Sequence, residues 1–331
     1  MATISDVASR AGVSTATVSR ALNGKSTVDP ELVARVLAAA EELGYQPNGP
    51  ARNLRRQEAA VVALIISDVE NPFFTAIARG VEDVAHADGY SVVLCNADEN
   101  VDKERRYVDV AIQERVAGVI ISPTSTATNV DLLLNRGTPL VAVDRPLPER
   151  TSDTVLVDTR VAACEATEHL LAEGYERIGC ITGPPGIRTA EDRLAGYRDA
   201  LRLAKVRASA RLVRRTEFKA AGAGRACAEL LDSAPPPDAL LVANSAMAVG
   251  VLAALRSRGL RPGPDVGLVA FDDVPWAGLV DPPLTVVAQP AYEIGSVAAR
   301  LLLARITDNG RAPTTTTLGA RLIVRGSSRR T

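Results

Sequence analysis

A short segment near the N-terminus combines small polar residues with one arginine, a composition that could read DNA. Residues 15–22 follow the tight turn Gly12-Val13-Ser14, and a helix carried on such a turn can enter the major groove. Thr15, Ala16 and Arg20 would then face the bases, and Arg20 could make a bidentate contact to guanine. The residues expected to bond phosphates are Thr3, Ser14, Thr17 and Ser19.

Spacing alone would also allow this region to be a small helical module that binds another protein. Local charge favours DNA, because residues 1–28 hold Arg10, Arg20 and Lys25 against Asp6 as the single acidic residue. A surplus of positive charge attracts the phosphate backbone. The whole chain has a net charge of −1, so its overall composition does not predict a polyanionic partner.

Capping signals predict the first two helices. Thr3 and Asp6 fit a capping box, so a helix should begin directly after Thr3. It should end at Gly12, because glycine adopts the left-handed conformation that closes a helix. Ser14 can then cap a second helix over residues 15–22. The two helices would be separated by a turn of about three residues.

A third helix and a linker are expected to follow. Asp29 as cap and Pro30 as the first helical residue predict a helix that ends at Gly44. The apolar residues that follow its helical period are Val33, Val36, Leu37, Ala40 and Leu43. Residues 46–60 contain two prolines, three arginines and a single large apolar residue, Leu54. That segment has too little apolar surface for a core of its own and is predicted to be a linker.

From Val61 onward, short apolar runs alternate with amphipathic stretches. Strands are predicted at 61–66, 91–95, 118–122, 139–143, 178–182, 239–243, 266–271 and 285–288, with a closing strand at 322–324. Strands that alternate with helices indicate parallel sheets covered on both faces. So many strands favour two α/β lobes over one sheet. Ligands of such folds bind beyond the carboxyl ends of the strands, where this chain is polar, glycine-rich or aromatic.

Several classes of protein and site are disfavoured by composition. The chain has 331 residues, of which 47% are hydrophobic, and its longest apolar runs fall far short of the roughly 20 residues that cross a bilayer. No export signal is apparent, so we expect a cytoplasmic protein. The cysteines, at 95, 164, 180 and 227, form no Cys-x-x-Cys pair, and we expect no metal site. No nucleophile, base and orienter set is recognisable, so we expect no catalytic residues and no cofactor.

The N-terminal sequence TISDVASRAGVSTATVSRALNGKSTVDPELVARVLAAAEELGYQPN closely resembles the DNA-binding domain of the lac repressor and galactose repressor family. The motifs D-V-A, A-G-V-S, T-V-S-R and G-Y-x-P-N recur in the family in this order. The resemblance continues through NPFF, VDRP, GPPGIRTAEDRLAGY and FDDVPWAGLVDPPLTVVAQP, and so covers essentially the whole chain.

The resemblance gives the linker a function. In the family, this segment becomes a short hinge helix in the minor groove, where a leucine is pushed between base pairs and bends the duplex. Here the leucine would be Leu54, with Arg52, Arg55 and Arg56 beside it for phosphates. A helix of this length is marginal in water, so it should order only against DNA and its twin in a dimer. Leu54 could instead be a linker residue packed on the core.

The resemblance also implies a small-molecule site between two lobes similar to those of periplasmic sugar-binding proteins. Aromatic walls and hydrogen-bonding groups would come from Phe73, Phe74, Arg145, Thr189, Arg193, Phe218, Asn244, Asp272, Trp276 and Gln289. Aromatic rings stack on sugar C–H faces, while carboxylate, amide and guanidinium groups bond adjacent hydroxyls. Each residue taken singly could instead pack a core or brace a loop. Asn244-Ser245 departs from the Asn-Asp common in the family, which removes one expected carboxylate.

The expected architecture is α/β, with an N-terminal helix-turn-helix domain and a two-lobed core like the periplasmic binding proteins. The helix-turn-helix domain would cover residues 1–46, the hinge 47–60, and the effector-binding and dimerisation domain 61–331. Within that domain, lobe 1 would comprise about 61–159 and 290–318, and lobe 2 about 160–289 and 319–331.

The resemblance implies a ligand-responsive transcription regulator, most simply a repressor. A homodimer would bind a pseudo-palindromic operator on double-stranded DNA, and a small effector, expected to be a sugar or sugar derivative, would control its affinity. No membrane partner is expected. The lobes alone would also suit a solute-binding protein or a sugar-metabolising enzyme on the same α/β fold. A DNA mobility shift and a ligand screen distinguish these alternatives.

Overall fold

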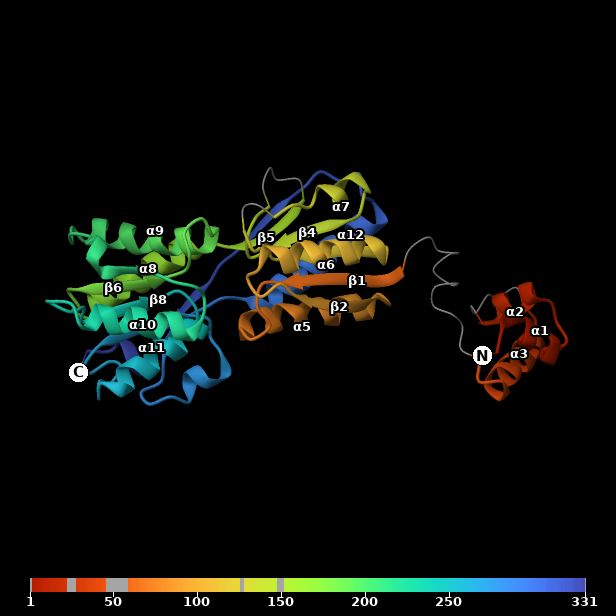
Figure 1. Cartoon of the computed structure of the whole chain (residues 1–331), viewed down its shortest axis with the longest axis horizontal. Helices are drawn as coiled ribbons and strands as arrows, with labels where there is room; N and C mark the ends of the chain where they lie inside the picture. Colours follow the sequence, from red (N-terminus) through yellow and green to blue (C-terminus); the bar gives the residue numbers. More distant parts are fainter. Residues whose placement is uncertain (1, 23–27, 46–58, 126–127, 148–151, 331) are drawn as a thin grey trace. The chain divides into compact units, whose positions relative to one another are not determined.

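The computed structural model describes residues 2–22, 28–45, 59–125, 128–147 and 152–330. The chain divides into two compact units, residues 1–59 and 60–331, and each is considered separately (Figure 1). The predicted hinge residues Arg52, Leu54 and Arg55 lie outside the described residues. Within the described part, no helix has both the length and the apolar character needed to cross a membrane.

The N-terminal unit contains α1 (Ile4–Ala11), α2 (Thr15–Leu22) and α3 (Pro30–Glu42). The capping box is confirmed: the Asp6 amide donates to Thr3 Oγ1 at 3.3 Å, and the Thr3 amide donates to Asp6 Oδ2 at 2.7 Å. Gly12 closes α1 with a φ of 64°. Asp29 caps α3 by accepting from the Glu31 amide. The predicted helix positions are therefore confirmed.

The three helices enclose one small apolar core. Its buried residues are Val7, Ala8, Ala11, Val18, Ala21, Val36, Ala39 and Ala40. Leu37 follows the predicted apolar pattern of α3 but is 52% exposed. Val36 points into the core, and a helix turns about 100° from one residue to the next, so Leu37 lies outside the buried stripe. The buried stripe of α3 is therefore narrower than the sequence pattern indicates.

Lobe 1 is built on a six-stranded sheet with the order β11-β5-β4-β3-β1-β2. Its strands are β1 (Ala59–Ile66), β2 (Ser91–Asn96), β3 (Val116–Ile121), β4 (Leu140–Val143), β5 (Asp153–Val157) and β11 (Thr315–Leu318). Its helices are α5 (Pro72–Ala87), α6 (Val101–Gln113), α7 (Asp131–Asn135) and α12 (Ala291–Thr307). The alternation of β1 shows why both faces are covered: Val62 and Leu64 join the core beneath α5 and α12, while Ala63 and Ile65 join the core beneath α6 and α7.

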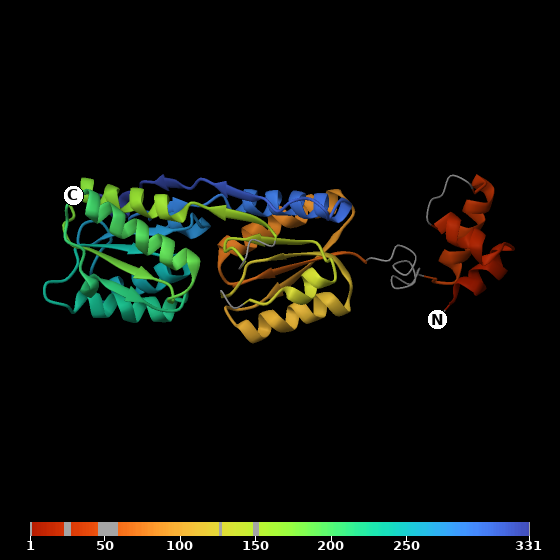
Figure 2. The ribbon, with the colours of Figure 1, turned by 90° about the horizontal axis from the view of Figure 1, so that it is seen from above.

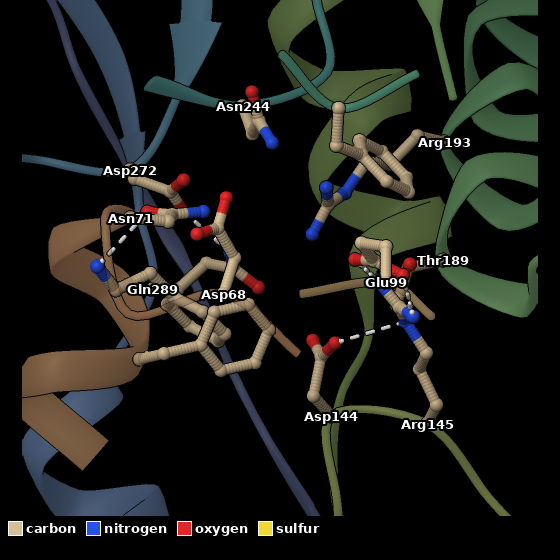
Figure 3. A pocket seen from close by; sticks show the side chains of 13 residues that line it. Asp68, Asn71, Glu99, Asp144, Arg145, Thr189, Arg193, Asn244, Asp272 and Gln289 are labelled. Carbon is tan, nitrogen blue, oxygen red and sulfur yellow. Dashed lines mark hydrogen bonds and ion pairs between the residues drawn. The ribbon is translucent and has the colours of Figure 1, made fainter. Parts of the chain in front are cut away.

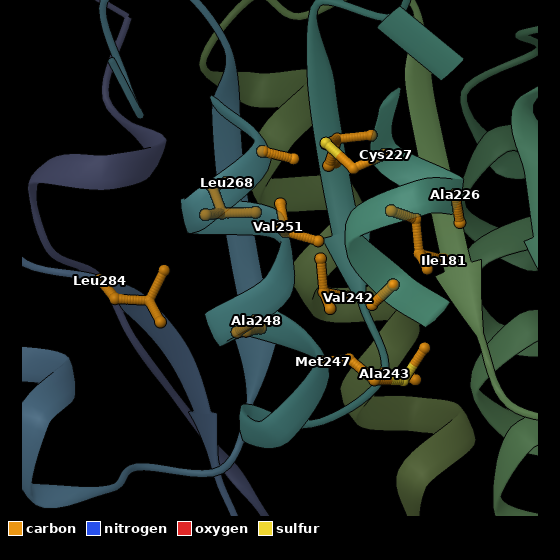
Figure 4. Packing of buried hydrophobic residues seen from close by; sticks show 14 of the residues in the cluster. Ile181, Ala226, Cys227, Val242, Ala243, Met247, Ala248, Val251, Leu268 and Leu284 are labelled. Atoms are coloured by element: carbon orange, nitrogen blue, oxygen red, sulfur yellow. The ribbon is translucent and has the colours of Figure 1, made fainter. Parts of the chain in front are cut away.

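Lobe 2 repeats this plan on a second six-stranded sheet, with the order β12-β10-β9-β8-β6-β7. Its strands are β6 (Ile178–Thr182), β7 (Val213–Arg215), β8 (Ala239–Val242), β9 (Gly267–Phe271), β10 (Thr285–Ala288) and β12 (Arg321–Ile323). Its helices are α8 (Thr159–Ala172), α9 (Arg188–Leu203), α10 (Ala220–Leu231) and α11 (Ser245–Ser257), with short 3₁₀ segments η2 (Ala210–Leu212), η3 (Pro275–Gly278) and η4 (Gly326–Ser328). Figure 4 shows the core between the sheet and α10 and α11, where Val242 and Leu268 meet Val251 and Cys227.

The chain passes between the lobes at three places: from β5 to α8, from β10 to α12, and from β11 to β12. Figure 2 shows the strands and connections that run from one lobe to the other. The pairing of β10 with β12 is antiparallel, whereas β6, β7, β8, β9 and β10 pair in parallel. Parallel pairing within each lobe gathers the carboxyl ends of the strands on one side, which is where a ligand site is expected.

Candidate functional site

A pocket lies between the carboxyl ends of the two sheets, and both lobes contribute to it (Figure 3). Its space is about 350 Å³ when the part open to solvent is included. The residues that line it are Asp68, Asn71, Phe73, Phe74, Glu99, Asp144, Arg145, Thr189, Arg193, Phe218, Asn244, Asp272 and Gln289. Nine of the ten residues predicted for an effector site thus lie together.

Strand ends place most of these side chains. In lobe 1, β1 leads to Asp68 and Asn71, β2 to Glu99, and β4 to Asp144 and Arg145. In lobe 2, β8, β9 and β10 lead to Asn244, Asp272 and Gln289, while Thr189 and Arg193 lie on the first turns of α9. The sequence prediction missed Asp68, Asn71, Glu99 and Asp144. Their signal was available, since each follows a predicted strand of lobe 1.

Three of the pocket carboxylates sit on unusual backbone. Glu99, Asp144 and Asp272 have φ values of 52°, 64° and 76°, in the left-handed region that residues with a side chain rarely adopt. Such conformations persist only where the surroundings hold them in place, and they gather at functional sites. All three residues follow a strand directly or within a few residues, so the turns leaving these strands aim the carboxylates into the pocket.

Arg145 is held by a bidentate pair with Glu99. Its two terminal nitrogens donate to the Glu99 carboxylate oxygens at 2.8 and 2.6 Å, and one of them also donates to the Pro123 carbonyl at 3.1 Å. Its Nε lies 3.4 Å from Asp144 Oδ2 but makes no hydrogen bond in the described part of the chain. Arg145 is buried, and burial disfavours its charge, but Glu99 outweighs that effect and raises its pKa. The Arg145 guanidinium is therefore fixed in place, while its own buried Nε remains a donor without a hydrogen-bond partner among the described residues.

Arg193 projects into the pocket from α9. One of its terminal nitrogens donates to the Ala243 carbonyl at 2.6 Å, and its guanidinium lies 4.4 Å from the centre of the Phe271 ring. Its side chain is only 5% exposed, and its Nε has no hydrogen-bond partner among the described residues. Burial lowers the pKa of Arg193, and the nearby carboxylates of Asp272 and Asp144 only partly offset that effect. The site thus contains a second buried cation with an unused donor.

Asp272 is oriented by groups of its own lobe. Its Oδ2 accepts from the amide and the hydroxyl of Ser245, and its Oδ1 accepts from Gln289 Nε2 at 2.6 Å. Gln289 Oε1 has no hydrogen-bond partner within the described ranges. Burial raises the pKa of Asp272, and that of Asp144, above the usual range of a carboxyl group. Ser245 therefore supports a pocket carboxylate from behind, although it replaces one that the family resemblance led us to expect.

Phenylalanine rings form the apolar part of the wall. Phe73 and Phe74 meet edge to face, with ring centroids 5.1 Å apart. Phe218 packs over Gly183, where an added Cβ would lie only 2.1 Å from the ring, so this position has room only for glycine. The structure does not bring Trp276 together with the other predicted residues: it lies in η3, outside the pocket lining, and packs against the core of lobe 2. Its strand-end position does not aim it at the pocket.

These groups suit a small polyhydroxylated molecule. Arg145 Nε and Arg193 Nε are unused donors, and Gln289 Oε1 is an unused acceptor. A buried polar atom without a partner is costly, so a ligand that supplies one is favoured. Hydroxyl groups can both accept and donate, and the rings can cover the C–H faces of the same ligand. Among the described residues, no group of three or more His, Cys, Asp or Glu side chains could hold a metal ion.

In the N-terminal unit, the side chains predicted to contact DNA differ in their exposure and in their hydrogen bonds. Thr15, Ala16 and Arg20 are exposed on α2, as base contacts require. Thr3 and Ser14 are also exposed, but their hydroxyls cap α1 and α2, and Thr17 shares a 2.9 Å hydrogen bond with Ser14. Ser19 is buried, so the structure does not place its side chain on the exposed surface with the others.

Comparison with known proteins is consistent with both sites. Residues 3–48 match the family described as bacterial regulatory proteins, lacI family, and residues 167–328 match a periplasmic binding protein-like domain. The ribose operon repressor of Halalkalibacterium halodurans is 40% identical over 306 residues, which cover 92% of this chain and 91% of the relative.

Two solved structures resemble the whole chain. The transcriptional regulator CelR in complex with cellobiose is 33% identical, covers 99% of this chain and 100% of its own, and has a TM-score of 0.76. The lac repressor dimer bound to operator and the anti-inducer ONPF is 27% identical, covers 99% of both chains, and has a TM-score of 0.87. This chain therefore belongs to the lacI family of bacterial regulatory proteins and is a DNA-binding transcriptional repressor controlled by a small effector.

Proposed function

We propose that the chain represses transcription as a homodimer on a pseudo-palindromic operator and that an uncharged sugar, bound in the pocket between the lobes, releases it from DNA. The observation that carries the ligand assignment is the set of unused polar atoms on Arg145, Arg193 and Gln289, three residues that line a pocket walled by phenylalanine rings. Hydroxyl groups on a compact ring satisfy donors and acceptors at the same time.

The charges of the pocket favour a neutral ligand. Its lining includes four carboxylates, on Asp68, Glu99, Asp144 and Asp272, against the two guanidinium groups of Arg145 and Arg193. Both terminal nitrogens of Arg145 are already taken up by Glu99. A phosphorylated sugar or a sugar acid would add negative charge to a buried site that already has an excess of it, which is costly. The ribose operon repressor relative makes D-ribose the natural first ligand to test.

We assign direct base contacts to Thr15, Ala16 and Arg20, because all three are exposed on the helix that follows the turn. The hydroxyls of Thr3, Ser14 and Thr17 are suited to phosphates, since a hydroxyl engaged in a cap keeps acceptor or donor capacity for a second partner. The hinge contacts of Arg52, Leu54 and Arg55 are proposed from the family resemblance alone. In a homodimer, the two identical helix-turn-helix domains then require two matched half-sites in the operator.

Two apolar surfaces support a homodimer. In lobe 1, the edge strand β2 exposes Val93 and Leu94, and an exposed apolar edge is a template for pairing with another chain. In lobe 2, a shallow groove between α10 and α11 is lined mostly by small residues, among them Ala220, Gly224 and Gly250. Each surface would be buried against its own copy in a two-fold arrangement. The lac repressor neighbour was solved as a dimer on its operator.

A thermal-shift panel tests the ligand class. The panel contains D-ribose, ribitol, D-cellobiose, D-ribose 5-phosphate and D-gluconate. A ligand that binds only the native state stabilises it by RT ln(1 + [L]/Kd), or about 2.7 kcal/mol at 100 times Kd. We expect an uncharged member to raise Tm, with the phosphate and the acid producing no shift. Stabilisation by the charged members alone would contradict the assignment.

A mobility shift on promoter fragments next to the gene tests repression. We expect binding that weakens steeply with added salt, as phosphate contacts require, and that is released by the sugar identified in the panel. Replacing one half-site of the bound fragment should remove most of the affinity. Binding that does not respond to any sugar that raises Tm would contradict effector control of the operator.

A further inference from the structure

Lys219 reaches from one lobe to the other at the edge of the pocket. It is the residue before α10 in lobe 2, and its Nζ lies 2.9 Å from Asp68 Oδ2 and 3.0 Å from Asp98 Oδ1, both in lobe 1. Glu70 Oε2 of the same lobe is 3.6 Å away. Asp68 lines the pocket, whereas Lys219 does not. One ammonium group thus joins both lobes to a wall of the ligand site.

The Asp68 carboxylate is held at both of its oxygens. Oδ1 accepts from the Glu70 amide at 3.0 Å, which fixes the turn after β1, and Oδ2 pairs with Lys219. The side chain of Asp68 is nearly fully buried, while that of Lys219 is 37% exposed. Removal of Lys219 would therefore leave a buried carboxylate without its counter-charge, which is far more costly than the loss of a solvent-exposed ion pair.

The surroundings keep Lys219 charged. Partial burial disfavours its ammonium form, but hydrogen bonds and attraction from Asp68 and Asp98 outweigh that effect and raise its pKa. The pKa of Asp98 shifts in the opposite direction: hydrogen bonds from Lys219 and Lys103 lower it, which favours the charged carboxylate. Within the described part of the chain, the ion pairs that Asp68, Glu70 and Asp98 make with lobe 2 all involve Lys219, so its loss would leave these carboxylates together at the edge of the pocket without a cation from lobe 2. The ion pairs therefore favour the arrangement in which the lobes are together.

We propose that Lys219 is a positioning residue of the effector site: it orients the Asp68 carboxylate in the pocket wall and holds the two lobes in the closed arrangement that binds the ligand. The effector part of this inference rests on the proposed function, while the effect on the lobes does not. If only the closed form binds, the apparent Kd equals the intrinsic Kd divided by the closed fraction. Loss of the latch formed by Lys219, Asp68 and Asp98 then weakens binding without removing any group that touches the ligand.

The chain supplies a matched control. Lys103 lies on α6 and pairs with the same Asp98 at 3.2 Å, but within lobe 1. Lys103→Met therefore removes a cation from the same carboxylate without removing a contact between lobes. The test compares Lys219→Met, Lys219→Arg and Lys103→Met in the full chain. Lys219→Arg keeps the charge, although a planar guanidinium cannot follow the three directions that the ammonium donors take.

The distance between lobes is measured first, without any sugar. Spin labels are placed at Val110 on α6 and Leu203 on α9, which are 42% and 62% exposed. Cys164 is partly exposed and could react with the spin label, so it is changed to Ser. The other three cysteines are buried and are left unchanged. Double electron–electron resonance measures the distance between the two labels. The distance distribution should be longer or broader for Lys219→Met, unchanged for Lys103→Met, and intermediate for Lys219→Arg. Raising NaCl from 50 to 500 mM should shift the native protein toward the Lys219→Met distribution, since salt screens the latch.

Ligand binding is then measured by calorimetry with D-ribose, or with the panel sugar that raises Tm most. We expect Lys219→Met to raise Kd about three- to tenfold and Lys103→Met to change it less than about twofold. The Kd of the native protein should rise with salt more than that of Lys219→Met. Identical distance distributions for native and Lys219→Met proteins would overturn the proposal, as would equal effects of the two methionine variants. A distance change without binding of any sugar would support the latch and contradict the effector assignment instead.

Discussion

Arg193→Met tests whether the buried guanidinium on α9 binds the effector. The methionine side chain keeps much of the length and apolar contact of arginine over the Phe271 ring, which lies 4.4 Å from the guanidinium. It removes the charge and the unused Nε donor, together with the hydrogen bond to the Ala243 carbonyl. A change in ligand affinity would then report the lost polar contact more than lost packing.

The expected magnitude follows from the number and kind of bonds lost. At least one charge-assisted hydrogen bond to a ligand hydroxyl disappears, and such a bond contributes about 1.5–3 kcal/mol. The Kd of the sugar should therefore rise about 10- to 150-fold. Asp144 and Asp272 also lose a nearby cation, which raises their pKa further and opposes their ionised forms. That effect acts in the same direction, because a protonated carboxyl accepts fewer hydrogen bonds.

The assay is calorimetric titration of the sugar that raises Tm most, together with operator mobility shifts. Arg188→Met is the control, because Arg188 lies on the same helix but is solvent-exposed and pairs with Asp192 on the surface. We expect operator affinity without sugar to stay within about twofold in both variants, since neither residue belongs to the N-terminal unit. An unchanged sugar Kd in Arg193→Met, or an equal rise in Arg188→Met, would refute the assignment of Arg193.

Three further predictions address the DNA-binding unit and the stability of the core. Arg20→Ala should weaken operator binding by about 1–3 kcal/mol and relax preference at one base position, measured by competition with single-base operator variants; a uniform loss on all sequences would mark Arg20 as a phosphate contact. Gly80→Ala should destabilise lobe 1 by about 1–3 kcal/mol or more, because the new Cβ would lie 2.1 Å from the Tyr292 carbonyl oxygen on α12. Urea unfolding measures this loss. Gly278→Ala is the control and should be near neutral, because there is open space around Gly278. Asp153→Asn should cost about 3–5 kcal/mol at neutral pH, because it breaks a buried 2.8 Å ion pair with Arg305. Burial opposes the charge of Asp153, but hydrogen bonds from Arg305 and Thr314 outweigh that effect and lower its pKa, so its stabilising contribution is present above the usual carboxyl range and lost as pH falls. Urea midpoints of native and Asp153→Asn proteins should therefore converge at acid pH, and a constant difference would contradict the ion-pair explanation.

Local sequence signals were sufficient for most of the fold. The caps at Thr3 and Asp29 and the glycine at position 12 act within a few residues, so they define the N-terminal helices in any tertiary context. Most of the predicted strands are buried apolar runs, such as β3, β4 and β8, whereas β2 at the edge of its sheet is mostly exposed. The strands that the sequence analysis missed are β5, β7 and β11; β7 and β11 consist largely of arginine and threonine. Their pairing depends on neighbours in the sheet more than on their own apolar pattern.

The candidate site divides in the same way. The sequence shows that polar residues follow the strands. This pattern and the family resemblance were the grounds for predicting the nine residues that line the pocket. Trp276 also follows a strand, yet η3 turns it toward the core of lobe 2. The direction in which a loop residue points is set by the turn and by its packing, and neither is encoded in spacing alone.

The sequence by itself determined the three N-terminal helices, the alternation of strands and helices, and the polar character of the strand ends, because each depends on residues close together in the chain. Only the tertiary structure decided which charges meet. The Arg145–Glu99 pair joins residues 46 apart in sequence, and Lys219–Asp68 joins residues 151 apart. The first pair forms when the sheet of lobe 1 brings the ends of β2 and β4 to the same edge, and the second forms only when the two sheets face each other. The electrostatic energy of each pair depends on a separation and a burial that the folded chain alone sets.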